Sequence, residues 1–585
     1  MSARRPTISP DLVASMIEST PDRVRRRLDR SPDAAAEWPW LEGEAAWTVV
    51  AGEETVTLPH GHLAGDAQIR CTCLLSPRCF HVLACLTRLE VALIEAPPER
   101  ADPIASAASD PTADLVEPSA SQRHAARELV AAASQLLGVG VASGGVVVQS
   151  GLLRSIHQVR AEGLHRAAAM GLRVLTGTGE VRSRSPSADP AQLAEDVADL
   201  LETCQRLLHE KAIPGFWIGT ARRRQIPVRP RKLRGLFAEP ILTRTGFAGA
   251  AAYLLGDDGR IYTASDVRPG EARHARDAYM GGIEIGTLIQ PAKRLARGVY
   301  LGTDLTASPD GRLGRGKGIR IAEQGSSNWY GQELESRFQR PLEDQWAAMY
   351  EHACLPEDTR EAGWDFAFFE GTILGASGPE LLFQPIGKAQ IVRLAIANEG
   401  EDLSFRENLR MLSHAPGLRL KIIGRVSPAD PRIVSPLAVA PISEGQRDDH
   451  GPRLEIPDSW CGRVCLGFDE IQRPFLVNAR PSPGLVPIHG QPIDDDPLGP
   501  LRRRWIAAML SGIDSRRASG SHSLRAEATA LGRLGFATGA ALLETLTSVP
   551  SAEGPTPIET FLATAVYLRT CSLERARFLA TLTAN

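Results

Sequence analysis

The sequence predicts a multidomain α+β protein, and three observations support that prediction. Its 585 residues are enough for several domains at about 100–200 residues each. Stretches with alternating apolar residues, typical of strands, are separated by stretches with helical spacing, and a proline-rich segment divides the chain near residue 100. The composition, 43% hydrophobic and 23% charged, excludes a mostly disordered chain and a polytopic membrane protein.

The N-terminal part is short and changes its pattern twice. Residues 1–44 have weak helical spacing and are predicted to form a helical arm. Residues 45–93 begin with AAWTVV and ETVTLP, which alternate like strands, continue with a third strand from Gln68 to Cys73, and end in the helical stretch FHVLACLTRLE. Residues 94–120 are rich in proline and small residues and are predicted to be a linker.

Four further segments are expected after the linker. Residues 121–212 are predicted to form a helical segment, and residues 213–340 a β-rich domain in which Gly256-Asp257-Asp258-Gly259 marks a hairpin. Residues 341–497 are predicted to form a second β-rich domain, and residues 498–585 a C-terminal helical domain. The chain has no repeat of fixed period.

The cysteines clustered between residues 71 and 79 give the clearest indication of a functional site, a metal site. Cys71, Cys73, Cys79 and His81 form the pattern C-x-C-x5-C-x-H, a Cys3His set of the kind that binds zinc tetrahedrally. Residues i and i+2 of a strand point to the same face, so Cys71 and Cys73 can reach one ion. Residues i and i+2 of a regular helix lie about 200° apart, so Cys79 is expected before the helix and His81 in its first turn. Four ligands, three of them thiolates, leave no open position, which predicts a structural rather than a catalytic zinc.

The sequence leaves three alternatives to this ligand set open. Cys85 lies one helical turn after His81 and could replace it, although packing in the core is the favoured interpretation. His60 and His62 flank a turn and are expected to be solvated loop residues rather than ligands. The four residues of the motif could also pack together as core without a metal.

The strands, the C-x-C-x5-C-x-H motif and the following helix, over about residues 45–92, resemble a SWIM-type zinc finger. The resemblance implies that Cys71, Cys73, Cys79 and His81 bind Zn²⁺, and that the finger binds DNA or protein partners rather than catalysing a reaction. The stretches RKLRGLFAEPILTRTGFAGAAAYLL and DGRLGRGKGIR are similar to long bacterial SWIM proteins. That second resemblance implies a protein partner, either an AAA-type ATPase or a von Willebrand A-type protein.

A basic segment stands out in a chain whose net charge is −3. Seven of its residues are candidates for binding the phosphates of DNA or RNA: Arg222, Arg223, Arg224, Arg229, Arg231, Lys232 and Arg234. The favoured alternative is a solvated loop. Its arginines would pair with acidic residues elsewhere, such as Asp494, Asp495 and Asp496.

No catalytic motif is identified, and the protein is predicted not to be an enzyme. Residues 311–318 approach the phosphate-loop consensus, but Gly318 replaces the Ser or Thr that binds Mg²⁺, and the following IRIAEQ is strand-like, so a hairpin turn is expected. Cys461 and Cys465 lack further ligands nearby and are expected to be buried strand residues. The competing hypothesis is an enzyme with an unrecognised active site in the β-rich middle, for example a nucleotide-handling one.

The cellular compartment is predicted from the lack of a signal peptide, the lack of a long apolar run and the clustering of the cysteines. The N-terminal residues lack the apolar region of a signal peptide, and no run of 18 apolar residues occurs, so no membrane association is expected. Clustered rather than dispersed cysteines favour a metal site in a reducing compartment. The sequence therefore predicts a cytoplasmic zinc-binding adaptor that recognises a protein of an ATPase-containing assembly or a nucleic acid.

Overall fold

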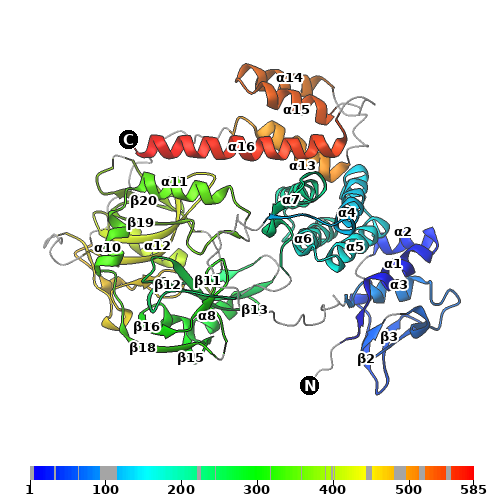
Figure 1. Ribbon diagram of the computed structural model, residues 1–585, viewed down its shortest axis with the longest axis horizontal. Coiled ribbons are helices and arrows are strands. Elements are labelled where there is room, and N and C mark those ends of the chain that lie inside the picture. The colour runs from blue at the N-terminus through cyan, green and yellow to red at the C-terminus, as the bar shows by residue number, and fades with distance from the viewer. Residues whose placement is uncertain are drawn as a thin grey trace. The chain divides into compact units, whose positions relative to one another are not determined.

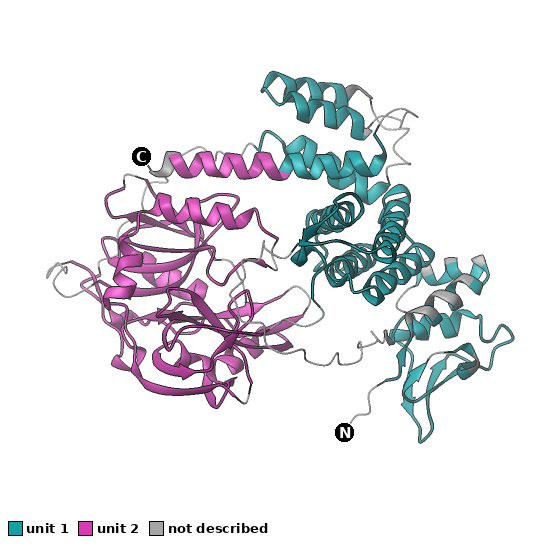
Figure 2. Ribbon diagram, viewed as in Figure 1, with its two compact units in different colours: residues 1–222, 494–568 teal, residues 223–493, 569–585 magenta. Residues whose placement is uncertain are grey.

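The computed structural model divides the protein into two compact units. Unit 1 comprises residues 1–222 and 494–568, and unit 2 residues 223–493 and 569–585 (Figure 2). The structure describes residues 5–31, 34–63, 65–91, 115–220, 225–243, 246–316, 318–356, 359–388, 390–396, 400, 402–442, 451–479, 496–512, 521–547 and 555–584. The architecture is α+β, as the sequence predicts, whereas the boundaries of the seven expected segments stay predictions.

The N-terminal part of unit 1 is a small sheet covered by helices (Figure 1). Antiparallel strands are ordered β2-β3-β4-β6, and a parallel three-stranded sheet is ordered β5-β1-β7. The strands are β1 (Thr7–Ile8), β2 (Trp40–Glu42), β3 (Ala46–Ala51), β4 (Glu54–Pro59), β5 (His62–Leu63), β6 (Arg70–Cys71) and β7 (Glu90–Val91). The helices are α1 (Pro10–Ser19), α2 (Asp22–Arg30) and α3 (Phe80–Leu86).

Burial in this part follows the alternation that the sequence shows. Trp47 and Val49 of β3 and Val56 and Leu58 of β4 point into one core, which α3 closes. The third strand is shorter than expected, because residues 66–68 form a 3-10 turn in which Gln68 Oε1 accepts a hydrogen bond from the backbone N–H of Gly65 (3.1 Å).

Helices make up the rest of unit 1. Four follow residue 119, namely α4 (Ala120–Val139), α5 (Val146–Ala161), α6 (His165–Ser183) and α7 (Pro190–His209). Both α4 and α7 start at side-chain caps: Ser119 and Gln122 cap each other reciprocally, and Asp189 accepts from two backbone N–H groups. Four others lie toward the C-terminus, namely α13 (Gly499–Ser511), α14 (Ser521–Arg533), α15 (Ala537–Thr547) and α16 (Pro557–Ala584). The division between the units falls within α16, after Leu568.

The predicted linker is only partly described. Residues 94–114 lie outside the described residues. Of the remainder, β8 (Leu115–Val116) pairs with β9 (Ile213–Pro214). Helix α1 contacts α5, and Val146 at the start of α5 packs against the core of the N-terminal part.

Two antiparallel sheets build unit 2. The first is ordered β13-β12-β11-β16-β18 and contains the predicted hairpin, in which Gly259 adopts a positive φ of 80°. The second is ordered β21-β20-β19-β22-β23-β25, and β21 also pairs in parallel with β23. The strands of the first sheet are β11 (Lys232–Leu242), β12 (Phe247–Gly256), β13 (Ile261–Pro269), β16 (Gly298–Thr303) and β18 (Arg320–Ser326). Those of the second are β19 (Phe366–Ser377), β20 (Glu380–Pro385), β21 (Val392–Leu394), β22 (Arg419–Val426), β23 (Ile433–Pro441) and β25 (Val464–Cys465).

Both sheets of unit 2 share one hydrophobic core. Phe237 of β11 stacks on Tyr253 of β12, and both contact Phe366 of β19 in the other sheet. The helices of unit 2 before α16 are α8 (Arg273–Met280), α9 (Ala292–Leu295), α10 (Gln332–Gln339), α11 (Leu342–Ala353) and α12 (Phe405–Ser413). Its short strands are β10 (Ile226–Pro227), β14 (Gly282–Ile285), β15 (Leu288–Pro291), β17 (Thr306–Ala307), β24 (Arg453–Leu454) and β26 (Leu476–Val477).

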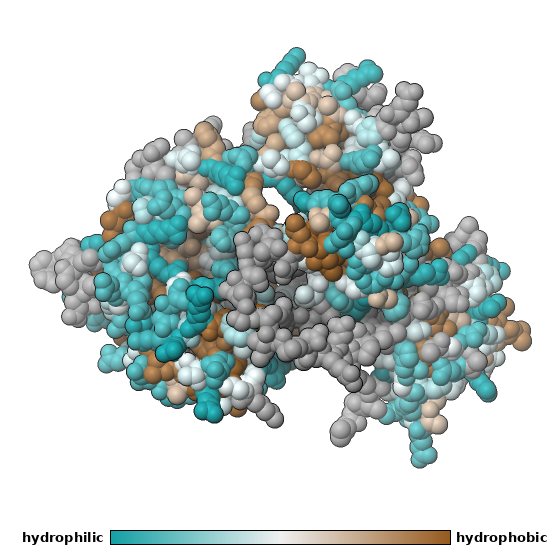
Figure 3. All heavy atoms as spheres, in the orientation of Figure 1, coloured by the Kyte–Doolittle hydropathy of each residue, from teal (hydrophilic) through white to brown (hydrophobic). Residues whose placement is uncertain are grey.

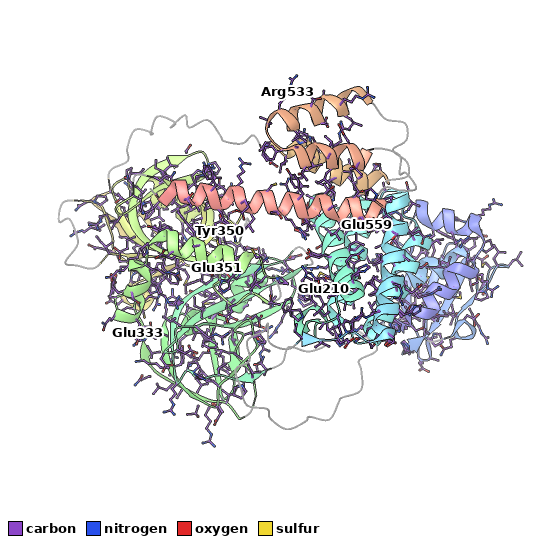
Figure 4. The ribbon with its side chains drawn as sticks, turned by 45° about the horizontal axis from the view of Figure 1, so that its top comes forward. Glu210, Glu333, Tyr350, Glu351, Arg533 and Glu559 are labelled. Carbon is purple, nitrogen blue, oxygen red and sulfur yellow. The ribbon has the colours of Figure 1, made fainter. Side chains whose placement is uncertain are left out.

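The end of α16 belongs to this core as well. Ala576 and Ala580 are buried in it, and Arg577 Nη2 donates a hydrogen bond to the carbonyl oxygen of Tyr350 on α11 (3.5 Å; Figure 4). On the face drawn in Figure 3, polar and apolar residues are interspersed over both units. No helix in the described part of the chain is both long and apolar enough to cross a membrane.

Candidate metal centre

Two local structures bring the motif together. Cys71 ends β6, which pairs with β4 in the register Val56–Cys71, and Cys73 follows two residues later. Cys79 is the extended N-cap residue of α3, and its Sγ accepts a hydrogen bond from the backbone N–H of Val82 (3.4 Å). His81 therefore lies in the first turn of α3, where the spacing predicts it.

The four side chains converge on one point. One ligand atom from each of Cys71, Cys73, Cys79 and His81 lies within 4.8 Å of the other three, and Cys71 Sγ is 3.9 Å from His81 Nδ1. Metal bonds of about 2.3 Å to sulfur and about 2.0 Å to nitrogen would place tetrahedral ligand atoms roughly 3.5–3.8 Å apart. The cluster is thus close to the geometry of a four-coordinate metal site. Among the described residues it is the one group of three or more His, Cys, Asp or Glu side chains close enough to hold an ion.

Burial shapes the protonation of these groups. Desolvation raises the pKa of the Cys71 and Cys79 thiols above the usual value, and desolvation together with nearby Arg27 lowers the pKa of His81. Thiols must lose their protons to bind a metal, and a bound cation would compensate the charge of the resulting thiolates, of which Cys79 is buried and Cys71 and Cys73 are partly exposed. A neutral His81 is already in the form that a metal ligand needs.

Backbone and aromatic contacts hold the ligands in place. The backbone N–H of Cys71 donates to Ser76 Oγ (3.0 Å), and the N–H of Thr72 donates to the carbonyl oxygen of Thr55 in β4 (3.0 Å). The ring of Trp38 lies 6.0 Å from that of Phe80 and 6.0 Å from that of His81. The motif itself gives no signal for Trp38, because this residue lies more than 30 positions before the first ligand.

The alternative ligands lie outside the cluster. Cys85 is fully buried in the core of the N-terminal part, and burial raises the pKa of its thiol to about 12. His60 Nε2 is 2.8 Å from the carbonyl oxygen of Gly43, and His62 Nδ1 is 3.2 Å from Thr7 Oγ1. Both histidines are exposed, and Cys85 packs in the core as expected, but only His60 lies in a loop, because His62 begins β5 and pairs with Thr7 of β1.

Only part of the basic segment can be placed. Arg222, Arg223 and Arg224 lie outside the described residues. Arg229 and Arg231 are exposed, and Lys232 begins β11. Arg234 forms an ion pair with Glu333 of α10, which Figure 4 labels: Nη2 donates a hydrogen bond to Oε1 (3.2 Å), and Nε lies 2.6 Å from Oε2. Of the acidic partners considered above, Asp496 instead pairs with Arg502 (3.3 Å), and Asp494 and Asp495 lie outside the described residues.

The region that approaches a phosphate loop is a turn between strands. Leu313 bridges to Ala307, Gly311 has a φ of +89°, and β18 rather than a helix follows at Arg320. Lys317 itself lies outside the described residues. The phosphate-loop interpretation is therefore excluded by its context, as expected.

The expectation that Cys461 and Cys465 are both buried strand residues is wrong for Cys461. Cys465 is buried in β25, as predicted, but Cys461 is half-buried in a left-handed turn with φ 51°, not in a strand, because a 3-10 turn at Asp458–Trp460 ends there. Cys461 lines a pocket of about 390 Å³ in unit 2, together with Tyr330, Glu455 and Asp458. Glu455 also pairs with Arg453 at 3.8 Å, and Cys461 Sγ lies 3.9 Å from the carbonyl oxygen of Ser459. Neither contact supplies the base that activates a nucleophile.

Comparisons of the chain with family models, with curated proteins and with solved structures found no match. The assignment of function consequently depends on the geometry of the cluster and on the motif that forms it.

Proposed function

We propose that this protein is a recognition adaptor whose N-terminal module is a SWIM-type finger held together by one structural zinc ion. The observation that carries the proposal is the convergence of three thiols and one imidazole from β6, the loop after it and the start of α3. Soft thiolates in a tetrahedral set favour Zn²⁺, and four protein ligands leave no position for a reactive water.

The proposed zinc adds to a core that two short sheets and three helices already build. Its binding free energy contributes to folding because it joins β6 to the start of α3. Four protein ligands leave the ion closed to substrates, so we assign this module a binding role rather than a catalytic one. The similarity of RKLRGLFAEPILTRTGFAGAAAYLL and DGRLGRGKGIR to long bacterial SWIM proteins supports a protein partner from an ATPase-containing assembly, of AAA type or von Willebrand A type.

Charge favours a protein partner over a nucleic acid. Between residues 1 and 91, twelve acidic residues outnumber ten arginines, and that segment contains no lysine. A module that grips phosphates would need the opposite balance.

Metal analysis of the purified protein tests the proposal. About one equivalent of zinc per chain is expected, by the four-ligand stoichiometry of structural sites. Cys73→Ser should lose most of it, whereas Cys354→Ser, which removes an exposed thiol of unit 2, should retain it. Zinc at the wild-type level in Cys73→Ser, or an absence of any metal in the wild type, would refute the assignment.

A further inference from the structure

Two leucines protrude from the loop of the metal motif. Leu74 is 104% exposed and Leu75 is 59% exposed, and they occupy the first two positions between Cys73 and Cys79. Leu74 exceeds every other large apolar residue of the described part of the chain in exposure. One fully exposed leucine beside a second that is more than half exposed forms an apolar protrusion, and exposed apolar surface of this kind favours a contact surface.

The loop presents these leucines on a fixed backbone. Cys73 and Cys79 both belong to the cluster, so the two ends of the loop are tied to one point. Within it, the backbone N–H of Ser76 donates to the carbonyl oxygen of Cys73 (3.2 Å), and Ser76 Oγ accepts from the backbone N–H of Cys71 (3.0 Å). A preorganised loop loses little conformational entropy when it binds.

Two arginines flank the leucines. Arg70 and Arg78 each precede a cysteine of the cluster, so the convergence of Cys71 and Cys79 brings the backbone positions of both arginines next to the base of the loop. Both are exposed, and neither forms an ion pair with another described residue. The surface therefore combines an apolar tip with a cationic base, which is complementary to an apolar cleft with a carboxylate rim.

We infer that Leu74 and Leu75 are the docking surface of this module, and that its occupant is a protein with an apolar cleft rimmed by Asp or Glu. This inference rests on the proposed function and names the part of the module that touches the partner. A nucleic acid fits less well, because two arginines on a module with a net negative charge neutralise few phosphates. A lipid surface fits less well, because stable membrane attachment takes more apolar surface than two leucines supply.

The first step of the test identifies the occupant. A photoreactive, apolar amino acid replaces Leu75 in the full-length protein, leaving Leu74 in place, and is activated in the native cell. A cross-linked protein identifies the candidate occupant, and it counts in favour of the inference only if the cross-linked site is an apolar cleft with Asp or Glu at its rim. Cross-links to nucleic acid or lipid alone, or none above the level of the same residue placed at Leu41, would overturn the inference.

The second step measures binding of the purified occupant. Replacement of both leucines by serine should weaken the affinity about tenfold or more, as loss of a central apolar anchor does. Arg70→Ala with Arg78→Ala should weaken it and reduce its dependence on salt. Leu41→Ser is the matched control, because Leu41 is a 55% exposed leucine of the same module on β2, and it should change nothing.

Zinc content separates this inference from the proposed function. All of these variants should hold zinc at the wild-type level, since none replaces a ligand. If the wild type lacks metal, the proposed function fails. If metal is present but the leucine pair can be replaced without loss of affinity, only the docking surface is refuted.

Discussion

Asp469 organises a buried polar cluster in unit 2. Its carboxylate accepts hydrogen bonds from Arg297 Nη2 (2.6 Å), from the hydroxyl of Tyr279 (3.1 Å) and from the backbone N–H of Cys465 (2.7 Å). The side chains of Arg297 and Asp469 are 5% and 4% exposed. Water is excluded, so the carboxylate is the main compensation for the charge of the guanidinium.

Asp469→Asn should therefore destabilise unit 2 strongly. The substitution keeps the shape but leaves Arg297 charged and unpaired, and breaking a buried pair in this way costs about 3–5 kcal/mol. Chemical denaturation measures the loss in free energy of unfolding. Glu407→Gln is the control: it breaks the exposed pair of Glu407 with Arg410, for which a change below about 1 kcal/mol is expected. Equal effects of the two substitutions would contradict the account.

The convergence of the Cys3His residues could be predicted from the sequence, whereas the polar cluster around Asp469 could not, for a physical reason. Cys71, Cys73, Cys79 and His81 lie within eleven residues, so local geometry decides whether they meet. Arg297 and Asp469 are 172 positions apart, and only the assembled fold brings them together. The contacts of Arg463 likewise depend on the assembled fold, because it donates to the carbonyl oxygens of Gly235 and Leu236, more than 200 positions away. The side chain is completely buried, and burial lowers its pKa to about 10.

At the scale of elements, the ends of α4 and α13 cross within unit 1. The backbone N–H of Val141 donates to the carbonyl oxygen of Met509 (3.0 Å), and that of Ala142 to the carbonyl oxygen of Leu510 (3.1 Å). Gly140 and Gly512 both adopt positive φ at the crossing, 83° and 86°. A Cβ on Gly140 would lie 2.3 Å from the backbone nitrogen of Gly512, so two chain segments approach here as only glycine permits.

Gly140→Ala should destabilise unit 1 by more than strain alone explains. Gly140 has φ 83° and ψ 146°, a backbone conformation outside the left-handed helical region that costs a residue with a Cβ about 1–3 kcal/mol, and the backbone clash adds to this cost. Gly52→Ala isolates the strain, because Gly52 has a φ of 70° and nothing within 4 Å of a Cβ. Thermal unfolding of both variants should show the larger loss for Gly140→Ala. A smaller loss there than for Gly52→Ala would mean that the crossing relaxes freely.

The long strands of the N-terminal part were predictable, and its shortest strands were not. β3 and β4 have six residues each, enough for alternation to emerge. β4 coincides with the predicted stretch ETVTLP, and β3 overlaps AAWTVV but extends one residue further, to Ala51. β1, β5 and β7 have two residues each, too few to carry a period. Their parallel pairing joins residues 7, 62 and 90, which only tertiary structure can specify.

Removal of the metal should unfold this N-terminal part while the helices of unit 1 persist. The proposed zinc ties β6 to α3, whereas α4–α7 are stabilised by their own apolar contacts and caps. Hydrogen exchange after chelation should show lost protection over β3, β4 and α3 and retained protection over α4–α7. Cys73→Ser without a chelator should reproduce the pattern. Loss of protection throughout α4–α7 would show that α1 and its contact with α5 are essential to the helices.

For the whole molecule, the distribution of charge bears on the choice of partner. The net charge is −3, and residues 1–91 are acidic on balance. The basic segment is the strongest local exception, but Arg234 is already neutralised by Glu333. Fewer cations are therefore free for phosphates than the sequence suggests, and long-range attraction of a polyanion is not expected.

The protein should accordingly show no saturable binding to nucleic acid at moderate salt. Fluorescence anisotropy of a labelled duplex and a labelled single strand, across about 50–200 mM salt, provides the measurement. If the seven basic residues between 222 and 234 did engage phosphates, the affinity would fall with a log–log salt slope of about −4 to −6, since each neutralised phosphate contributes about −0.9. Replacement of Arg222, Arg223 and Arg224 by alanine would then flatten that slope by about 3, on every sequence alike. Such a slope would indicate that the protein recognises nucleic acid rather than a protein partner. If no such slope is found, the acidic balance of residues 1–91 and the Arg234–Glu333 pair are sufficient to explain why phosphates are not bound.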